Sequence, residues 1–148
     1  MLKADHRKVA ELFAKVKANE DGDNGDTFDS IRRELVMHTH LEETIFYPYV
    51  LDHGNEELQK VCREGIEEHR QVKMFLEELG SMSSNRDEFA AKLKVLMEDV
   101  EHHVKEEEGE LFPQFKDQFD DEVLTSLGAR MAEEKATASG NAVRTVSA

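Results

Sequence analysis

The sequence is poor in the residues that make covalent cross-links and in long apolar runs. It has a single cysteine, Cys62, so it can form neither an intramolecular disulfide nor a cysteine-based zinc site. That usage is typical of a reducing compartment. No apolar run approaches the length of a membrane span, and the N-terminal residues lack the apolar core of a signal peptide. We therefore expect a cytoplasmic protein.

Basic residues are also scarce. Lysine and arginine total 19 against 33 aspartates and glutamates, which gives a formal net charge of −14. Nucleic-acid-binding proteins present basic patches, and anionic membrane surfaces attract basic segments. We therefore expect neither nucleic acid nor membrane as a partner. The length of 148 residues suits one domain with a sizeable apolar core.

Two stretches of the chain, 38–48 and 103–113, share one pattern. Each has a histidine, a glutamate four residues later, and a proline ten residues after the histidine. On a helix, residues four apart lie on one face about one turn from each other. An imidazole and a carboxylate then point the same way and can hold a metal ion. The proline predicts the end of the helix soon after the site.

The repeat extends beyond these two stretches. Residues 5–9 and 68–72 both read acidic residue, histidine, arginine, any residue, valine. Each half of the chain therefore predicts a helical hairpin with a histidine on its first helix and the His-x3-Glu pair on its second. Two such hairpins make an all-α, up-and-down antiparallel four-helix bundle. Six ligand-type residues would converge at its centre: His6, His38, Glu42, His69, His103 and Glu107.

Apolar spacing predicts where the helices lie. We expect helices at about 2–19, 28–50, 56–80 and 86–112, and a short fifth helix capped by Asp120 or Asp121. The domain would cover residues 1–135, and the small, polar stretch 136–148 would be a flexible C-terminal tail. His38 and Glu42 stand on the apolar stripe of the second helix, with steps of three or four. A buried, unpaired His and Glu would be costly there, and a metal ion removes that cost.

This pattern of His, HxxxE, His and HxxxE, with a proline after each HxxxE, resembles the hemerythrin-like (HHE cation-binding) domains over residues 2–115. The resemblance implies a non-haem di-iron centre: two iron ions joined by an oxo or hydroxo bridge. The four histidines would be terminal ligands, and Glu42 and Glu107 would bridge the ions. Imidazole and carboxylate without thiolate suit iron or manganese, and zinc is a further alternative.

One departure from the family bears on function. Oxygen-carrying hemerythrins have a further histidine one turn from the third-helix histidine, whereas this chain has Gly65 and Lys73 at those positions. The reduced ligand set resembles that of bacterial hemerythrin-like proteins that handle peroxide, oxygen, nitric oxide or iron. We expect catalase-like disproportionation of H2O2, or reaction with O2, at an open di-iron centre in a monomer or weak homodimer. The alternatives are an O2 or NO sensor or carrier, an iron storage or repair protein, and a purely structural metal bundle.

Several other residues have two readings. Tyr49 lies seven residues after Glu42, either closing the end of the core with its hydroxyl in water or standing near the metal as a hydrogen-bond donor or extra ligand. Glu43 and Glu110 are further candidates for coordination. Solvated side chains are expected at His40, His53, His102, Glu106 and Glu108. Cys62 is expected to pack in the core.

Overall fold

The computed structural model describes the backbone of residues 2–147 and the side chains of residues 2–138. Its helices, in chain order, are α1 (Leu2–Ala18), α2 (Gly25–Leu41), η1 (Glu42–Phe46), α3 (Tyr47–His53), α4 (Glu56–Gly80), α5 (Asp87–Glu106), η2 (Glu107–Leu111), α6 (Phe112–Gln118) and α7 (Asp121–Ser147). Residues 2–147 contain no β-strand. None of these helices has both the length and the apolar character needed to cross a membrane.

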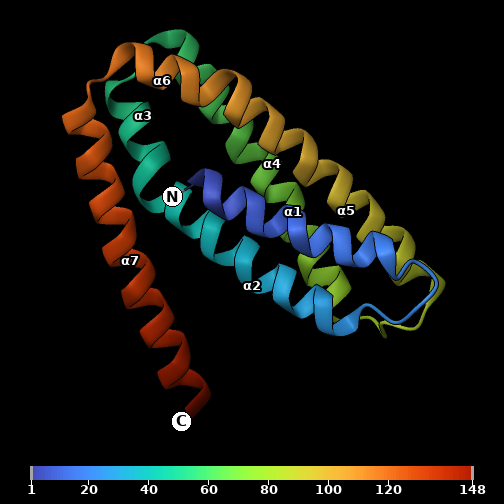
Figure 1. Ribbon diagram of the computed structural model, residues 1–148. Coiled ribbons are helices and arrows are strands. Elements are labelled where there is room, and N and C mark those ends of the chain that lie inside the picture. Colours follow the sequence, from blue (N-terminus) through green and yellow to red (C-terminus); the bar gives the residue numbers. More distant parts are fainter. Residues whose placement is uncertain (1, 148) are drawn as a thin grey trace.

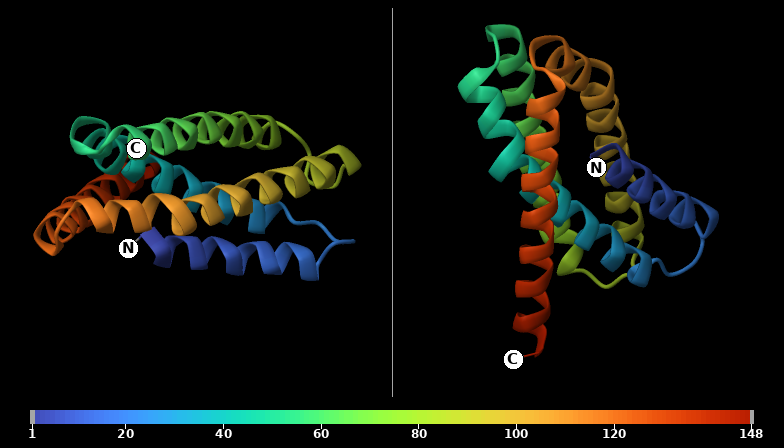
Figure 2. Two further views of the ribbon diagram at one scale, coloured as in Figure 1. Left: turned by 90° about the horizontal axis from the view of Figure 1, so that it is seen from above. Right: turned by 60° about the vertical axis from the view of Figure 1, so that its left-hand side comes forward.

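Four helical rods form the predicted up-and-down bundle. The rods are α1, the continuous run α2–η1–α3, α4, and the continuous run α5–η2–α6. Figures 1 and 2 show that the loops after α1 and after α4 lie together at one end, while α3, α6 and the start of α4 lie at the other. Within each hairpin the two rods pack side by side, α1 against α2 and α4 against α5, and the hairpins contact each other through α1 with α5 and α2 with α4. Helix α7 lies outside the bundle against α2 and η1 and is the fifth helix.

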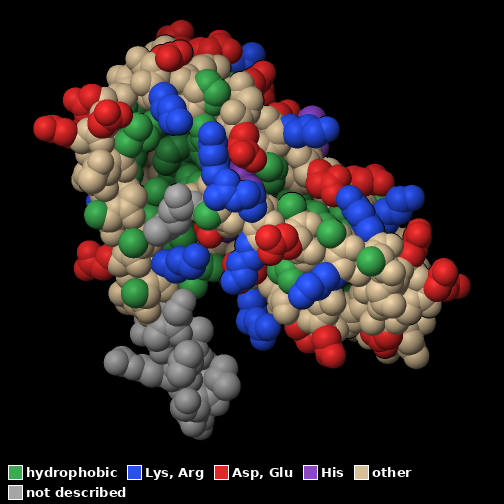
Figure 3. Space-filling view, in the orientation of Figure 1, with side chains coloured by type: hydrophobic (Ala, Val, Ile, Leu, Met, Phe, Trp, Pro, Cys, Tyr) green, Lys and Arg blue, Asp and Glu red, His purple; other side chains and the backbone are tan. Residues whose placement is uncertain are grey.

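The core consists of two apolar clusters with a polar layer between them. One cluster, at the loop end, is built from α1, α2, α4 and α5 and includes the buried Phe13, Ile31, Leu76 and Leu96. The other, at the α3 and α6 end, includes Leu41, Val50, Leu58, Phe115 and Met131. Beside the second cluster lies a groove of about 240 Å³ between α7 and the bundle. Its apolar side chains are visible in the upper left of Figure 3.

The two prolines do not end their helices, which corrects the sequence prediction. Pro48 and Pro113 stand in the first turns of α3 and α6, and the chain stays helical to His53 and Gln118. A proline inside an α-helix clashes with the carbonyl four residues earlier. Here each proline follows one turn of π-helix, η1 or η2, in which the hydrogen bonds run to the fifth residue back. The wider turn gives the ring room.

Helix ends agree with the sequence prediction at some points and not at others. The Asp120 carboxylate accepts a hydrogen bond from the Val123 backbone N–H at 3.1 Å, which confirms Asp120 as the cap of α7. Helix α2 begins at Gly25, earlier than predicted. Helix α7 also continues to Ser147, whereas the fifth helix was predicted to be short. The side chains of most of the predicted tail, 136–148, lie outside the described residues, and its flexibility stays a prediction.

Candidate metal centre

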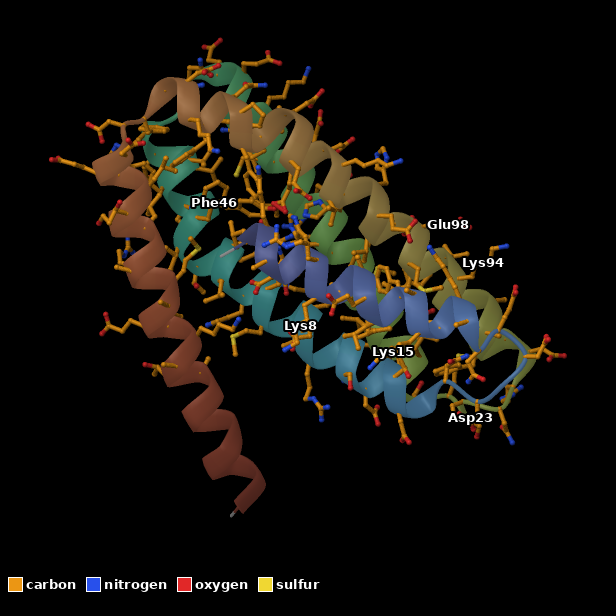
Figure 4. The ribbon with its side chains drawn as sticks, in the orientation of Figure 1. Lys8, Lys15, Asp23, Phe46, Lys94 and Glu98 are labelled. Carbon is orange, nitrogen blue, oxygen red and sulfur yellow. The ribbon has the colours of Figure 1, made fainter. Side chains whose placement is uncertain are left out.

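The fold brings the six predicted ligand residues together in the polar layer. Their nitrogen and oxygen atoms form two groups of three: His6, His38 and Glu107 in one, which we call the first triad, and Glu42, His69 and His103 in the other, the second triad. Each triad takes two histidines from one half of the chain and its glutamate from the other half. All six residues are buried. Figure 4 shows nitrogen- and oxygen-tipped side chains gathered between the helices, in the part of the bundle where Phe46 is labelled.

The donor atoms face one another at short distances. The Nε2 atoms of His6 and His38 are 3.1 Å apart, and those of His69 and His103 are 3.2 Å apart. Glu42 Oε1 lies 3.1 Å from the Nε2 atoms of both His38 and His69, which belong to different triads. The glutamates therefore stand where a carboxylate can touch two ions at once.

Glu42 provides the clearest sign that this arrangement suits a metal. Its side chain is fully buried, and among the described residues neither carboxylate oxygen has a well-aligned hydrogen bond, although Oε1 lies 3.1 Å from the Nε2 atoms of His38 and His69. A buried carboxylate left unpartnered costs several kcal/mol, on the order of 1–3 or more. A cation between the triads removes that cost. Four imidazoles and two carboxylates without a thiolate match the ligands that iron and manganese take.

Without a metal, the charges of the cluster balance internally. Burial lowers the pKa of His38, but Glu42, Asp5 and Glu107 outweigh burial and hold that pKa well above its usual value. Burial likewise opposes the charged form of His103, yet Glu107, Glu42 and Glu68 raise its pKa to about 12. Burial raises the pKa of Glu42, but His38, Glu107 and His103 together outweigh burial and hold that pKa well below its usual value. Protons on these imidazoles must leave when a cation binds.

Outer carboxylates orient the imidazoles. The outer ring nitrogen, Nδ1, faces a carboxylate oxygen in three histidines: Asp5 at 3.1 Å from His38, Glu68 at 2.7 Å from His103, and Glu108 at 3.2 Å from His6. A hydrogen bond at Nδ1 fixes the tautomer and leaves Nε2 free to bind a metal. In His69 the Nδ1 has no hydrogen-bond partner within the described part of the chain, and the nearest oxygen of Glu43 is 3.8 Å away.

Sequence reasoning missed Asp5 and Glu68; it expected Glu108 in solvent, with support of a neighbouring ligand as the alternative, and the structure favours that alternative. The signal was present, because an acidic residue directly precedes the first-helix histidine in both halves, as Asp5-His6 and Glu68-His69. Neighbours on a helix point about 100° apart. The acid therefore reaches the histidine on the next helix instead of the one beside it. That cross-helix contact is visible only in the tertiary structure.

One tyrosine, Tyr47, lies between the two triads and contacts residues of both. Its side chain is 1% exposed, and its hydroxyl donates a hydrogen bond to Glu107 Oε2 at 3.0 Å and lies 3.3 Å from His69 Nε2. Burial, together with Glu42 and Glu107, raises the pKa of Tyr47 far above its usual value, so the phenol keeps its proton. Phe112 has the same position in the second half and stacks on His6 with ring centroids 6.0 Å apart. Only one side of the centre therefore has a phenol.

Tyr49, the sequence candidate for this role, lies elsewhere. Its ring packs against His53, with centroids 4.4 Å apart, and against Phe119. The cause is the π-helical turn η1, in which the Tyr47 N–H bonds the Glu42 carbonyl five residues back. Counting in α-helical turns from Glu42 selects residue 49, whereas the wider π-turn brings residue 47 above the glutamate.

Gly65 makes room for this tyrosine. A Cβ atom at Gly65 would stand 3.1 Å from the Tyr47 hydroxyl oxygen and 3.5 Å from His103 Cε1. The extra space that the sequence predicted beside the missing histidine is therefore occupied by a phenol. Lys73, the other position one turn from His69, points away from the cluster and pairs with Glu43 at 2.6 Å.

The remaining candidates stay outside the two triads. His102 is exposed and pairs with Glu106 at 2.9 Å, so the rival HxxxE pair faces solvent as predicted. His40 is less solvated than predicted, because it pairs with Glu134 of α7 at 2.8 Å. Glu110 is exposed. His53 is exposed and stacks on Tyr49.

Cys62 is packed in the second apolar cluster, fully buried. Burial and the nearby Glu42 and Glu107 raise the pKa of its thiol to about 12. Because the thiolate is the reactive form, we expect a thiol reagent at pH 8 to modify the native protein at least about 100-fold more slowly than the unfolded protein. Absorbance of released thionitrobenzoate measures both rates. Comparable rates in the two states would show that the thiol is accessible.

Comparison with known proteins agrees with this geometry. The family model described as the hemerythrin HHE cation-binding domain matches residues 1–115. An uncharacterised hemerythrin-like protein of Schizosaccharomyces pombe is 31% identical over 105 residues, which are 70% of this chain and 52% of that protein. A protein named DNA nickase from a Nostoc species is 29% identical over 114 residues, covering 76% of this chain and 31% of the relative. No solved structure matches the chain.

The chain thus spans about half the length of the first relative and about a third of the second. The matched region contains both hairpin repeats and all six residues of the two triads. On the family match, the duplicated hairpins and the converging histidines and glutamates, the chain belongs to the hemerythrin family and forms a hemerythrin-like, metal-binding HHE domain.

Proposed function

We propose that this domain holds two iron ions, one at each triad, and disproportionates hydrogen peroxide in a catalase-like reaction. The observation that carries the proposal is the pair of buried triads, in which Glu42 stands 3.1 Å from a histidine of each. Six protein residues for two ions leave coordination positions for a small molecule. Bound iron would supply the two-electron redox chemistry that the side chains of the chain lack.

The space beside the triads limits the substrate to a few atoms. A cavity of about 20 Å³ touches His6, His38, His69 and His103 and is otherwise walled mainly by apolar side chains. A cavity of that size holds about one water-sized molecule. Hydrogen peroxide, dioxygen and nitric oxide are of this order, whereas an organic substrate is not.

Tyr47 is the proton-bearing group of this proposal. Its hydroxyl lies against Glu107 and the second triad, and its raised pKa keeps it protonated at neutral pH. The phenol has one hydroxyl hydrogen, which would turn from Glu107 to a small molecule bound between the triads. The neighbouring Glu107 carboxylate, at 3.0 Å, keeps the hydroxyl oriented.

A sensor or carrier of O2 or NO is the second candidate. It is favoured by one observation, the contact of Lys135 on α7 with Asp5, which connects an outer helix to the surroundings of the centre. Iron storage or delivery fits less well, because the six residues of the triads are buried and the cavity beside them measures about 20 Å³. The net charge of −14 does not favour nucleic acid, so we do not extend the name of the Nostoc relative to this chain.

The test combines metal content with turnover. Protein produced with iron should contain about two irons per chain and should release oxygen from hydrogen peroxide, recorded with an oxygen electrode. Glu107→Ala should abolish the release, whereas the exposed His102→Ala, one residue from His103, should keep it. Two irons without oxygen release would favour the sensor or carrier. Fewer than one iron per folded chain would refute the di-iron centre.

A further inference from the structure

Helix α7 reaches the surroundings of the first triad through one lysine. Lys135 Nζ donates a hydrogen bond to Asp5 Oδ1 at 3.3 Å. The other oxygen of the same carboxylate, Asp5 Oδ2, lies 3.1 Å from His38 Nδ1. The side chain of Asp5 is only 10% exposed. A chain of three side chains therefore leads from α7, outside the bundle, to a predicted metal ligand at its centre.

A second contact holds α7 in the same place. Glu134, the residue before Lys135, pairs with His40 of α2 at 2.8 Å. Earlier in the helix, Leu127 and Met131 are buried in the second apolar cluster. Figure 1 shows α7 outside the four-rod bundle. The Lys135–Asp5 pair is therefore part of a packed interface rather than a chance surface contact.

The two halves of the chain differ at this point. Glu68 is the counterpart of Asp5 in the second half, and its carboxylate faces His103, Glu106 and His102. Among the residues whose side chains are described, no lysine or arginine pairs with Glu68. A cation from α7 thus acts on the first triad alone. The hairpin repeat does not explain the contact of Lys135 with Asp5, since α7 lies outside the repeat.

We propose that Lys135 is a positioning residue that couples the docking of α7 to metal binding at the first triad. By holding Asp5 Oδ1, it keeps Oδ2 aimed at His38 and so keeps the His38 Nε2 facing the metal position. Partners one step beyond a metal ligand commonly change metal affinity by roughly 10- to 100-fold. The inference rests on the proposed iron binding. Because such coupling acts equally in both directions, iron bound at the first triad also stabilises α7 in its docked position.

The main test is iron release from the full-length, loaded protein to a chelator. In Lys135→Met one of the two irons should leave roughly 3- to 10-fold faster than in the unmodified protein, with the other unchanged. Lys135→Arg, which keeps the charge and the donor, should restore the slow rate. Glu134→Gln loosens the neighbouring contact without touching Asp5 and should leave both rates unchanged. The Lys135→Met effect should vanish in an Asp5→Asn background.

Equal acceleration of both irons, or the same acceleration in Glu134→Gln, would overturn the proposal, because either result means general loosening of α7. Two irons in the unmodified protein with no change in Lys135→Met would refute this inference and leave the proposed function standing. An unmodified protein that binds no iron would refute the proposed function instead.

A metal-free readout completes the design. In the protein without iron, the unfolding midpoints of Lys135→Met, Asp5→Asn and the double variant form a double-mutant cycle. The two shifts should be non-additive, with Lys135→Met having little effect once Asp5 has lost its charge. Additive shifts would show that the lysine and the aspartate do not act on each other and would overturn the proposal.

Discussion

Removal of iron is expected to lower the unfolding midpoint by about 8–16 °C. A ligand at about 1,000 times its Kd stabilises the folded state by about 4 kcal/mol, and 1 kcal/mol moves the midpoint of a domain of this size by roughly 2–4 °C. The physical reason is the buried Glu42, whose oxygens have no well-aligned hydrogen bond among the described residues. Scanning calorimetry of the protein before and after chelation measures the difference.

Replacement of Glu42 or Glu107 should remove the dependence of the unfolding midpoint on iron. In Glu42→Ala and Glu107→Ala the midpoint should become nearly independent of iron, because each glutamate contacts histidines of both triads. His102→Ala should behave like the unmodified protein, since this histidine is exposed and pairs with Glu106. A Glu42→Ala protein that still gains the full stabilisation from iron would contradict the assignment of the triads.

Substitution of Gly65 should have the second largest effect. Gly65→Val places methyl groups where a Cβ would already be 3.1 Å from the Tyr47 hydroxyl oxygen. Overpacking of this kind costs about 1–3 kcal/mol, which lowers the midpoint by roughly 2–12 °C in a domain of this size. Of the displaced groups, Tyr47 borders the second triad and His103 belongs to it, so that variant should also lose about one of two irons. Calorimetry and metal analysis give the two values.

Gly65→Ala separates crowding from the general effect of losing a glycine. Alanine in a helix interior is favoured over glycine by about 1 kcal/mol, so at Gly65 this gain should be cancelled by the contact with Tyr47. In Tyr47→Phe, which lacks the crowded oxygen, the same change should stabilise the protein. Gly128→Ala in α7, where an added Cβ meets no atom within 4 Å, is the matched control and should stabilise. A Gly65→Ala gain equal to that of Gly128→Ala would show that Tyr47 does not fill the space.

Local sequence pattern was enough to predict the bundle and the six converging residues. His38 and Glu42 stand four apart on an apolar stripe, and the same spacing recurs at His103 and Glu107. Because an α-helix repeats every 3.6 residues, such spacing determines which side chains share a face. The duplication then placed the faces opposite each other. The identity of the ion and the reaction do not follow from spacing, since iron and manganese accept the same donors.

The tertiary structure alone decided what lies next to these six residues. Tyr47 rather than Tyr49 lies beside the triads because of a single π-helical turn, η1, which shifts every later residue relative to α-helical counting. The partners Asp5 and Glu68 act across helices, so their role depends on how neighbouring helices pack. Lys135 lies 130 residues from Asp5 in the chain. No local periodicity connects residues so far apart, and only the docking of α7 brings them together.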